Sequence, residues 1–430
     1  MKVWRLDPDV EPGAVGVDAA ELDRMVAELQ EAIDAGKLFH GAQMTVYRGG
    51  KRVLDVGGGT ARVRTGVPVT PDSLFVLFSA TKGLAGLAML MLYERKKFHY
   101  DEPVAKYWPE FTREVPQKAA VTIRHVMSHR AGFPLGPRWL DAEKWGDRAA
   151  IRKAMAEVRL RFTPGERNAY HAMNYGHMVN ELITRIDGRD CGAFLREEVF
   201  APLGLRDLHL GLPDDAALRD RVAWCYNEIN LSPGKGAARA TGVVSSELEH
   251  AAAQDAAMSE AQVEAEAAGA DIPGQSRRPP ARYADIPEMW QEFNWPETQR
   301  AVLPAAGAIG TARDLGALYA FLAQGGARGE LALVSREGLA YATTPTNRAG
   351  DMDGTIGYPI RWGLGFHMGM LGRGSTLRSF GHAGAGGQIG FADPARELAF
   401  AFATNGELAP EFQLWRYRLQ GMAFDACKGD

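Results

Sequence analysis

The segment Phe78-Ser79-Ala80-Thr81-Lys82-Gly83 places a serine and a lysine three positions apart, directly before an apolar run that extends to Tyr93. The run predicts a helix over residues 79–96 that is buried nearly all round. Residues three apart share one face of a helix, so we expect the Ser79 hydroxyl to lie beside the Lys82 amine. Partial desolvation favours the neutral amine, which can accept a proton from a hydroxyl. Backbone N–H groups at the helix N-terminus can also stabilise an oxyanion.

The Ser-x-x-Lys pair alone is a weak signal, because most such pairs are a helix cap followed by a solvated lysine. Two further motifs strengthen it. Tyr170 follows a Pro164-Gly165 turn and precedes an apolar helical stretch. Near the C-terminus, the glycine-rich segment Gly381-His382-Ala383-Gly384-Ala385 precedes a predicted strand. A serine beside a lysine, with a tyrosine and a glycine-rich segment elsewhere in the chain, is a candidate arrangement for nucleophilic catalysis.

In this order, the motifs resemble those of the serine β-lactamase and penicillin-binding-protein superfamily, which Ser-x-x-Lys and Lys-Thr-Gly mark. The resemblance is greatest to class C β-lactamases and to the family VIII carboxylesterases related to them. It covers most of the chain, including residues 106–110, 121–134 and 202–205. It implies a β-lactamase-like α/β fold, in which helices flank an antiparallel sheet and a mainly helical domain is inserted.

The resemblance also implies roles for individual residues. Ser79 corresponds to the nucleophile, Lys82 to the base that activates it, and Tyr170 to the tyrosine that carries a proton to the leaving group. His382-Ala383-Gly384 corresponds to the Lys-Thr-Gly strand, so His382 and Gly384 are expected to line the substrate site. The backbone N–H groups of Ser79 and Ala385 are expected to form the oxyanion hole.

Two departures from the class C pattern bear on the substrate. The Tyr-x-Asn motif is Tyr170-His171-Ala172 here, and a histidine that is only partly charged at neutral pH replaces the lysine of Lys-Thr-Gly. Both changes favour a carboxylic ester hydrolase that acts on short-chain esters through an acyl-enzyme on Ser79. The alternatives are an acyltransferase, a D-amino-acid amidase, a weak β-lactamase or a non-catalytic penicillin-binding-type protein.

A second tyrosine and three histidines allow other interpretations of the site. Tyr175 competes with Tyr170, although the Pro-Gly spacing favours Tyr170. His125 and His129 are four residues apart, a spacing that can bind zinc, but the glutamate of His-Glu-x-x-His is absent, so a structural role is expected. His382 as the base of a Ser-His-Asp triad would need a different scaffold. No metal and no organic cofactor is therefore predicted.

Strand patterns lie at both ends of the chain, with mainly helical patterns between them. A helix is predicted over residues 17–38, and a hairpin follows it around Gly49-Gly50. Further strands are expected over residues 362–370, 388–392 and 397–404. We expect residues 1–78 and 300–430 to form the sheet domain and residues 79–299 the helical domain, with an Ala/Glu- and Pro-rich insertion near 234–285.

The composition excludes several classes of protein. The 430 residues carry 49 lysines and arginines against 53 aspartates and glutamates, and a formal net charge of −4 does not indicate a nucleic-acid-binding surface. The three cysteines are far apart, which argues against a disulfide framework. The N-terminus lacks the pattern of a signal peptide, and the apolar run after Lys82 is too short to span a bilayer. We expect a cytoplasmic enzyme that acts on a small-molecule ester and has no membrane partner. The oligomeric state is left open.

Overall fold

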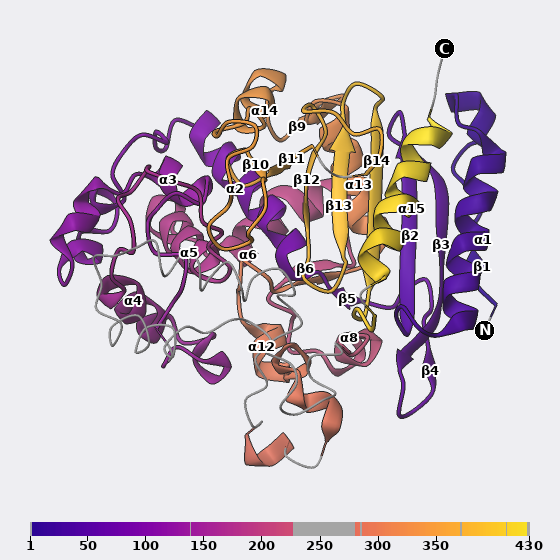
Figure 1. Cartoon of the computed structure of the whole chain (residues 1–430), viewed down its shortest axis with the longest axis horizontal. Coiled ribbons are helices and arrows are strands. Elements are labelled where there is room, and N and C mark those ends of the chain that lie inside the picture. Colours follow the sequence, from indigo (N-terminus) through magenta and orange to yellow (C-terminus); the bar gives the residue numbers. More distant parts are fainter. Residues whose placement is uncertain are drawn as a thin grey trace.

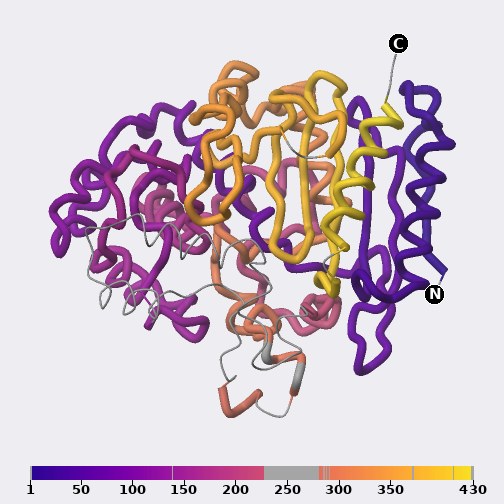
Figure 2. The backbone as a smooth tube through the Cα atoms, in the orientation of Figure 1, coloured from indigo at the N-terminus to yellow at the C-terminus, as the bar shows by residue number. Residues whose placement is uncertain are grey.

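The computed structural model describes residues 2–137, 139–226, 280–283, 286–369, 372–409 and 411–427 (Figures 1 and 2). Most of the insertion expected near 234–285 lies outside these residues. The helices are α1 Ala19–Ala35, α2 Thr81–Glu94, α3 Ile123–Met127, α4 Arg148–Glu157, α5 Asn174–Asp187, α6 Cys191–Leu195, α7 Ala201–Leu203, α8 Ala216–Arg221, α12 Pro296–Arg300, α13 Ala312–Ala323, α14 Arg336–Ala342 and α15 Phe412–Ala426.

Strands from both ends of the chain form one antiparallel sheet, in the order β1-β3-β2-β14-β13-β12-β11-β10, with β4 beside β3. The first and last parts of the chain therefore lie side by side (Figure 2). The strands of this sheet are β1 Trp4–Arg5, β2 Gly41–Arg48, β3 Lys51–Arg62, β4 Val67–Pro68, β10 Arg361–Trp362, β11 His367–Met368, β12 Phe380–Ala383, β13 Ile389–Asp393 and β14 Leu398–Thr404. Smaller sheets contain β5 Phe75–Val76, β6 Leu208–Leu210 and β7 Ala308–Gly310, and β8 Ala327–Arg328 with β9 Leu331–Ala332.

The two faces of strand β14 show why helices cover both sides of the sheet. Successive side chains of a strand point to opposite faces. Phe400 and Phe402 pack into the core that α1 and α15 close, and Figure 1 shows these two helices side by side. Ala399 and Ala401 belong to the other core, where small side chains let α13 approach the sheet closely. The alternation of alanine and phenylalanine therefore specifies a layer of helices on each face.

The hairpin predicted around Gly49-Gly50 is confirmed as β2 and β3. Both glycines have positive φ angles, 57° and 72°, as a tight two-residue hairpin turn requires. The strand expected over residues 397–404 is β14, and it pairs with β2. The single strand expected over residues 362–370 is instead the short hairpin of β10 and β11, because Gly365 turns the chain with a φ of 90°.

Helix α2 is buried nearly all round, as its sequence predicts, and it contacts both β12 and α5. At Gly86, an added Cβ would lie 3.2 Å from the backbone of Gly365. This contact brings the N-terminal half of α2 against the β10–β11 hairpin. Among the described residues, no helix combines the length and the apolar character needed to cross a membrane.

Candidate active site

Ser79 lies in a short 3₁₀ turn, Phe78–Ala80, that leads directly into α2. The expected helix therefore starts with a tighter turn, although Ser79 and Lys82 remain neighbours. The preceding residue, Phe78, has a φ of 44°, a left-handed conformation that costs free energy in a bulky residue. Its ring is held by an edge-to-face contact with Phe293, with centroids 4.8 Å apart. The turn leaves Ser79 partly exposed while the residues on either side of it are buried.

The amine of Lys82 is completely buried and has three polar neighbours. Its Nζ donates hydrogen bonds to the backbone carbonyls of Ala172, at 2.8 Å, and Ala305, at 2.9 Å. It lies 3.3 Å from Oγ of Ser79. Carbonyl oxygens only accept, so these two would occupy both N–H groups of a neutral amine. The lone pair of that amine would then face the third neighbour, the Ser79 hydroxyl.

Burial lowers the pKa of Lys82 well below its usual value. Desolvation disfavours the ammonium form, and within the described parts of the chain no carboxylate pairs with Lys82 to offset it. The environment therefore favours the protonation state that can take a proton from a serine.

The structure places Tyr170 over the same lysine. Tyr170 precedes α5, is partly exposed, and has its ring centroid 4.7 Å from the Lys82 Nζ. Burial raises its pKa above the usual value, and a hydrogen bond with Ser79 offsets only part of that shift. Tyr175 is buried in α5, and its hydroxyl donates to the backbone carbonyl of Lys82 at 3.3 Å. Of the two tyrosines, Tyr170 is the one that adjoins the serine.

The residues that hold Tyr170 in place were not found by sequence reasoning. The indole of Trp362, in β10, stacks on the Tyr170 ring with centroids 5.5 Å apart and planes 11° apart. His129, whose φ is 59°, packs against the same ring at 4.8 Å. The carboxylate of Asp353 accepts a hydrogen bond from the Tyr170 backbone N–H at 2.9 Å. Asp353 stands beside a glycine in the sequence, where it cannot be told from an ordinary turn residue.

His382 lies within strand β12, nearly completely buried, with its ring 6.1 Å from that of Tyr170. Its Nδ1 is 2.8 Å from the carbonyl of Ala383, and because a carbonyl only accepts, Nδ1 carries the proton. Burial is the main cause that lowers the pKa of His382 well below its usual value, and the neighbouring basic groups of Lys82 and His367 act in the same direction. The imidazole is therefore neutral at neutral pH, and it supplies even less positive charge than its sequence suggests.

The end of β12 approaches the chain just before Ser79. A Cβ added to Gly384 would lie 2.6 Å from the carbonyl oxygen of Leu77, so only glycine fits there. Ala385 follows in an exposed turn. Within the described residues, the backbone N–H groups of Ser79 and Ala385 donate no hydrogen bond. Two backbone donors thus remain available near the serine.

The two histidines with zinc-like spacing have other roles in the packing. His125 forms a capping box with Thr122 at the start of α3, and Nδ1 of His129 accepts a hydrogen bond from the backbone N–H of His171. The described residues contain no cluster of three or more histidine, cysteine, aspartate or glutamate side chains that could hold a metal ion.

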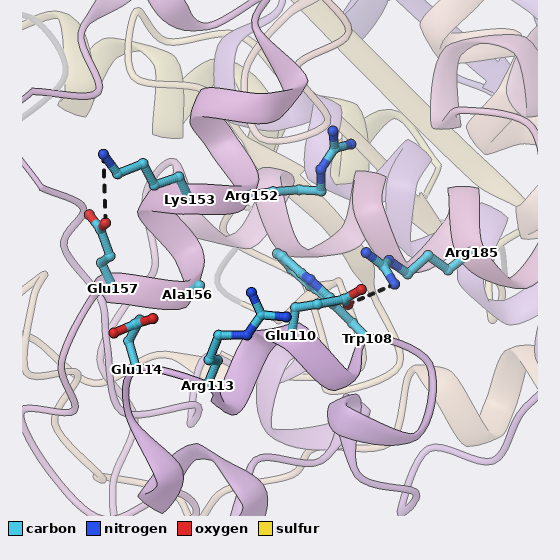
Figure 3. A pocket seen from close by; sticks show the side chains of 9 residues that line it. All are labelled: Trp108, Glu110, Arg113, Glu114, Arg152, Lys153, Ala156, Glu157 and Arg185. Atoms are coloured by element: carbon cyan, nitrogen blue, oxygen red, sulfur yellow. Dashed lines mark ion pairs between the residues drawn. The ribbon is translucent and has the colours of Figure 1, made fainter.

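A separate pocket of about 300 Å³ lies on the helical part of the molecule (Figure 3). Ion pairs join Glu110 to Arg185 at 3.0 Å and Lys153 to Glu157 at 3.8 Å along its walls. Its lining contains no serine, threonine or cysteine, so it lacks a hydroxyl or thiol nucleophile for acyl transfer. The lining residues are Trp108, Glu110, Arg113, Glu114, Arg152, Lys153, Ala156, Glu157 and Arg185.

Comparison with known proteins shows similarity to esterases and to a penicillin-binding protein homolog. The chain is 32% identical over 388 residues to the esterase/beta-lactamase LipL of Mycobacterium tuberculosis. The aligned region covers 87% of this chain and 79% of LipL. It resembles the crystal structure of a penicillin-binding protein homolog from Caulobacter crescentus, with a TM-score of 0.74, 29% identity, and coverage of 99% and 100% of the two chains. It also resembles the crystal structure of a family VIII carboxylesterase, with a TM-score of 0.71, 26% identity, and coverage of 96% and 98%.

These similarities extend over nearly the whole fold, and they confirm the resemblance that the sequence motifs indicate. The family match itself spans residues 22–422, which include every residue assigned to the candidate site. The chain belongs to the Beta-lactamase family.

Proposed function

We propose that the protein is a carboxylic ester hydrolase that forms an acyl-enzyme on Ser79. The observation that carries this proposal is the environment of Lys82. Two carbonyls occupy the N–H donors that a neutral amine would have, and the Ser79 hydroxyl lies 3.3 Å from the same nitrogen. A buried, uncharged amine whose lone pair points toward a partly exposed serine hydroxyl activates that serine as a nucleophile.

In the first half of the reaction, Ser79 Oγ forms a bond to the ester carbonyl carbon while its proton passes to Nζ of Lys82. The carbonyl oxygen becomes an oxyanion, which the backbone N–H groups of Ser79 and Ala385 bind. Collapse of this intermediate breaks the bond to the alcohol oxygen. Tyr170 gives that oxygen its phenolic proton and regains one from the Lys82 ammonium, so the alcohol leaves neutral.

In the second half, a water molecule takes the place of the alcohol. As the water oxygen attacks the acyl carbon, a water proton passes to Tyr170 while the phenolic proton passes to Nζ of Lys82. The second intermediate expels Ser79 Oγ, which recovers the proton. The products are the free acid and the original enzyme, so the proton balance closes without a metal or an organic cofactor.

Two observations support esters over β-lactams as substrates. His382 replaces the lysine of the Lys-Thr-Gly motif and is buried and neutral, so it offers no cation to a β-lactam carboxylate. Ala172 stands where the Tyr-x-Asn amide would be, and its contact with Lys82 is made by its backbone. An ester has no amide N–H that would be left unpaired there. Short-chain esters are therefore the proposed substrates.

A second candidate activity is β-lactam hydrolysis. It is favoured by LipL, whose name carries both activities and which is 32% identical to this chain. The two activities share the serine and differ in how the site holds the substrate, so a direct comparison of rates separates them.

The nucleophile gives the first test. Ser79→Ala removes the only atom that can form the acyl-enzyme in this mechanism, so ester hydrolysis and covalent labelling by a fluorophosphonate probe should both disappear. Hydrolysis of p-nitrophenyl butyrate and mass spectrometry of the labelled protein measure the two effects. Full activity in the folded variant would overturn the mechanism.

The two tyrosines provide a matched pair of variants. Tyr170→Phe and Lys82→Ala should each lower kcat by about two to four orders of magnitude, the range that follows from loss of general acid–base catalysis. Tyr175→Phe removes a hydroxyl whose one hydrogen bond among the described residues is to a backbone carbonyl, and it should change kcat far less. Steady-state kinetics would reject the assignment if Tyr175→Phe were the more damaging change.

The low pKa of Lys82 predicts how activity varies with pH. Below that pKa the amine is protonated and cannot accept the serine proton, so kcat/KM should be low in acid and rise with pH as the ammonium loses its proton. Because burial raises the pKa of Tyr170, its phenol should stay protonated across neutral and mildly alkaline pH. A pH profile that falls from acid to neutral pH would contradict a neutral Lys82 as the base.

Substrate choice separates the two candidate activities. Wild-type protein should hydrolyse p-nitrophenyl butyrate with a kcat/KM at least about tenfold above that for a penicillin, because the site lacks a cation for the carboxylate, and such differences in polar contact are worth a factor of ten or more. Longer p-nitrophenyl esters, measured beside nitrocefin, would define the acyl preference. An equal or greater kcat/KM for the penicillin would favour a β-lactamase.

A further inference from the structure

Asp353 is a buried carboxylate, and among the described residues its hydrogen bonds all come from uncharged N–H groups. It is 1% exposed and lies between α14 and β10. Its Oδ1 accepts hydrogen bonds from the backbone N–H groups of Tyr170, at 2.9 Å, and of Thr355 and Ile356, at 3.0 Å each. Its Oδ2 accepts from the indole Nε1 of Trp362, also at 3.0 Å.

A buried carboxylate is costly unless hydrogen bonds or a cation compensate for its lost hydration. Within the described ranges, no lysine or arginine forms an ion pair with Asp353, so its N–H donors supply this compensation. The bonds from Thr355 and Ile356 are local and fix the carboxylate in its own turn. The other two bonds extend to parts of the chain that are distant in sequence.

One of the distant bonds comes from Tyr170 itself, and the other comes from a residue that contacts Tyr170. One holds its backbone, which lies before α5 and so has no helical hydrogen bonds to fix it. The other holds the Trp362 indole, on which the Tyr170 ring stacks. The same indole also stacks on His367, with centroids 5.2 Å apart and planes 22° apart. The phenol is therefore fixed through its backbone and through its ring by the same carboxylate.

We propose that Asp353 is a positioning residue for proton transfer by Tyr170. Its carboxylate sets the place of the Tyr170 backbone and of the indole that supports the ring, so the phenolic oxygen stays within reach of Ser79 and Lys82. Proton transfer requires heavy atoms within hydrogen-bonding distance, and a small displacement of the donor slows it strongly. This role rests on the proposed function, because it acts through the tyrosine of that mechanism.

A purely structural role for Asp353 predicts a different result. If Asp353 only stabilised its own turn, its loss would weaken the fold and would lower activity whether or not Tyr170 carried a hydroxyl. If it positions the hydroxyl, its loss should matter only while the hydroxyl is present. The two roles are thus separated by the coupling between the two residues.

The experiment is a double-mutant cycle of Asp353→Asn and Tyr170→Phe. Asparagine keeps one acceptor oxygen for the backbone N–H groups, but its amide N–H₂ cannot accept from the indole of Trp362. With p-nitrophenyl butyrate, Asp353→Asn should lower kcat by about ten- to a hundredfold in the wild-type background, with KM changed by less than about threefold, as expected when only transition-state help is lost. In the Tyr170→Phe background the same change should lower kcat by less than about threefold.

Asp351→Asn is the matched control. Asp351 is in the same loop and exposed, and within the described residues its side chain accepts one hydrogen bond, from the backbone N–H of Arg348. The Asp351→Asn variant should leave kcat unchanged. Trp362→Phe is a second variant that keeps a stacking ring but removes the N–H, and its effect should also vanish in the Tyr170→Phe background. If Asp353→Asn does not fold, Trp362→Phe provides the test in its place.

The outcomes are distinct. An equal fall in kcat in both backgrounds, or no fall in either, would overturn the positioning role while leaving the hydrolase intact. Ester turnover that is absent from the wild type, or that survives Ser79→Ala, would overturn the proposed function itself, and the positioning role with it.

Discussion

The burial of the Lys82 amine is the interaction on which the site depends. Its two carbonyl partners come from segments far apart in the chain, Ala172 just before α5 and Ala305 just before β7. These segments must meet closely, since a Cβ added to Gly176 in α5 would lie 2.3 Å from the backbone nitrogen of Ala305. Helix α2, the start of α5 and the approach to β7 thus converge on one nitrogen atom. Their packing excludes water from it, and this exclusion is what lowers its pKa.

The sheet gives that convergence a rigid support. Strand β14 carries phenylalanines toward α1 and α15 and alanines toward α13, so each face accepts a helix of matching bulk. Strand β12, two strands away from β14, carries His382 to the site, and Gly384, directly after the strand, lies against the carbonyl of Leu77. The position of the serine is therefore tied to the sheet by backbone contacts, which side-chain motion does not alter.

Local patterns in the sequence predicted the elements that build the site. The apolar run after Lys82 predicted α2, the two glycines predicted the β2–β3 turn, and the spacing of Ser79 and Lys82 predicted their contact. All of these depend on residues close together in the chain. The left-handed φ of Phe78 was not predictable, because it is stabilised by Phe293, which lies far away in the sequence.

The contacts around Tyr170 escaped sequence reasoning for the same reason. Asp353 and Trp362 reach it from more than a hundred residues away, and neither belongs to a motif that predicts such contact. Burial also changed the chemistry of a residue that the sequence did identify. His382 was expected to keep part of a charge, but its surroundings leave it neutral.

The pairing of β2 with β14 has a consequence for how the protein is made. The backbone N–H of Gly41 donates to the side chain of Asn405, 364 residues later, and the ladder beside it joins the same distant segments. During synthesis, the β2–β3 hairpin emerges long before its partner strand exists. Its unpaired edge and the apolar face of α1 stay exposed until β14 has been translated. A sheet whose central strands lie so far apart in the chain is expected to assemble slowly.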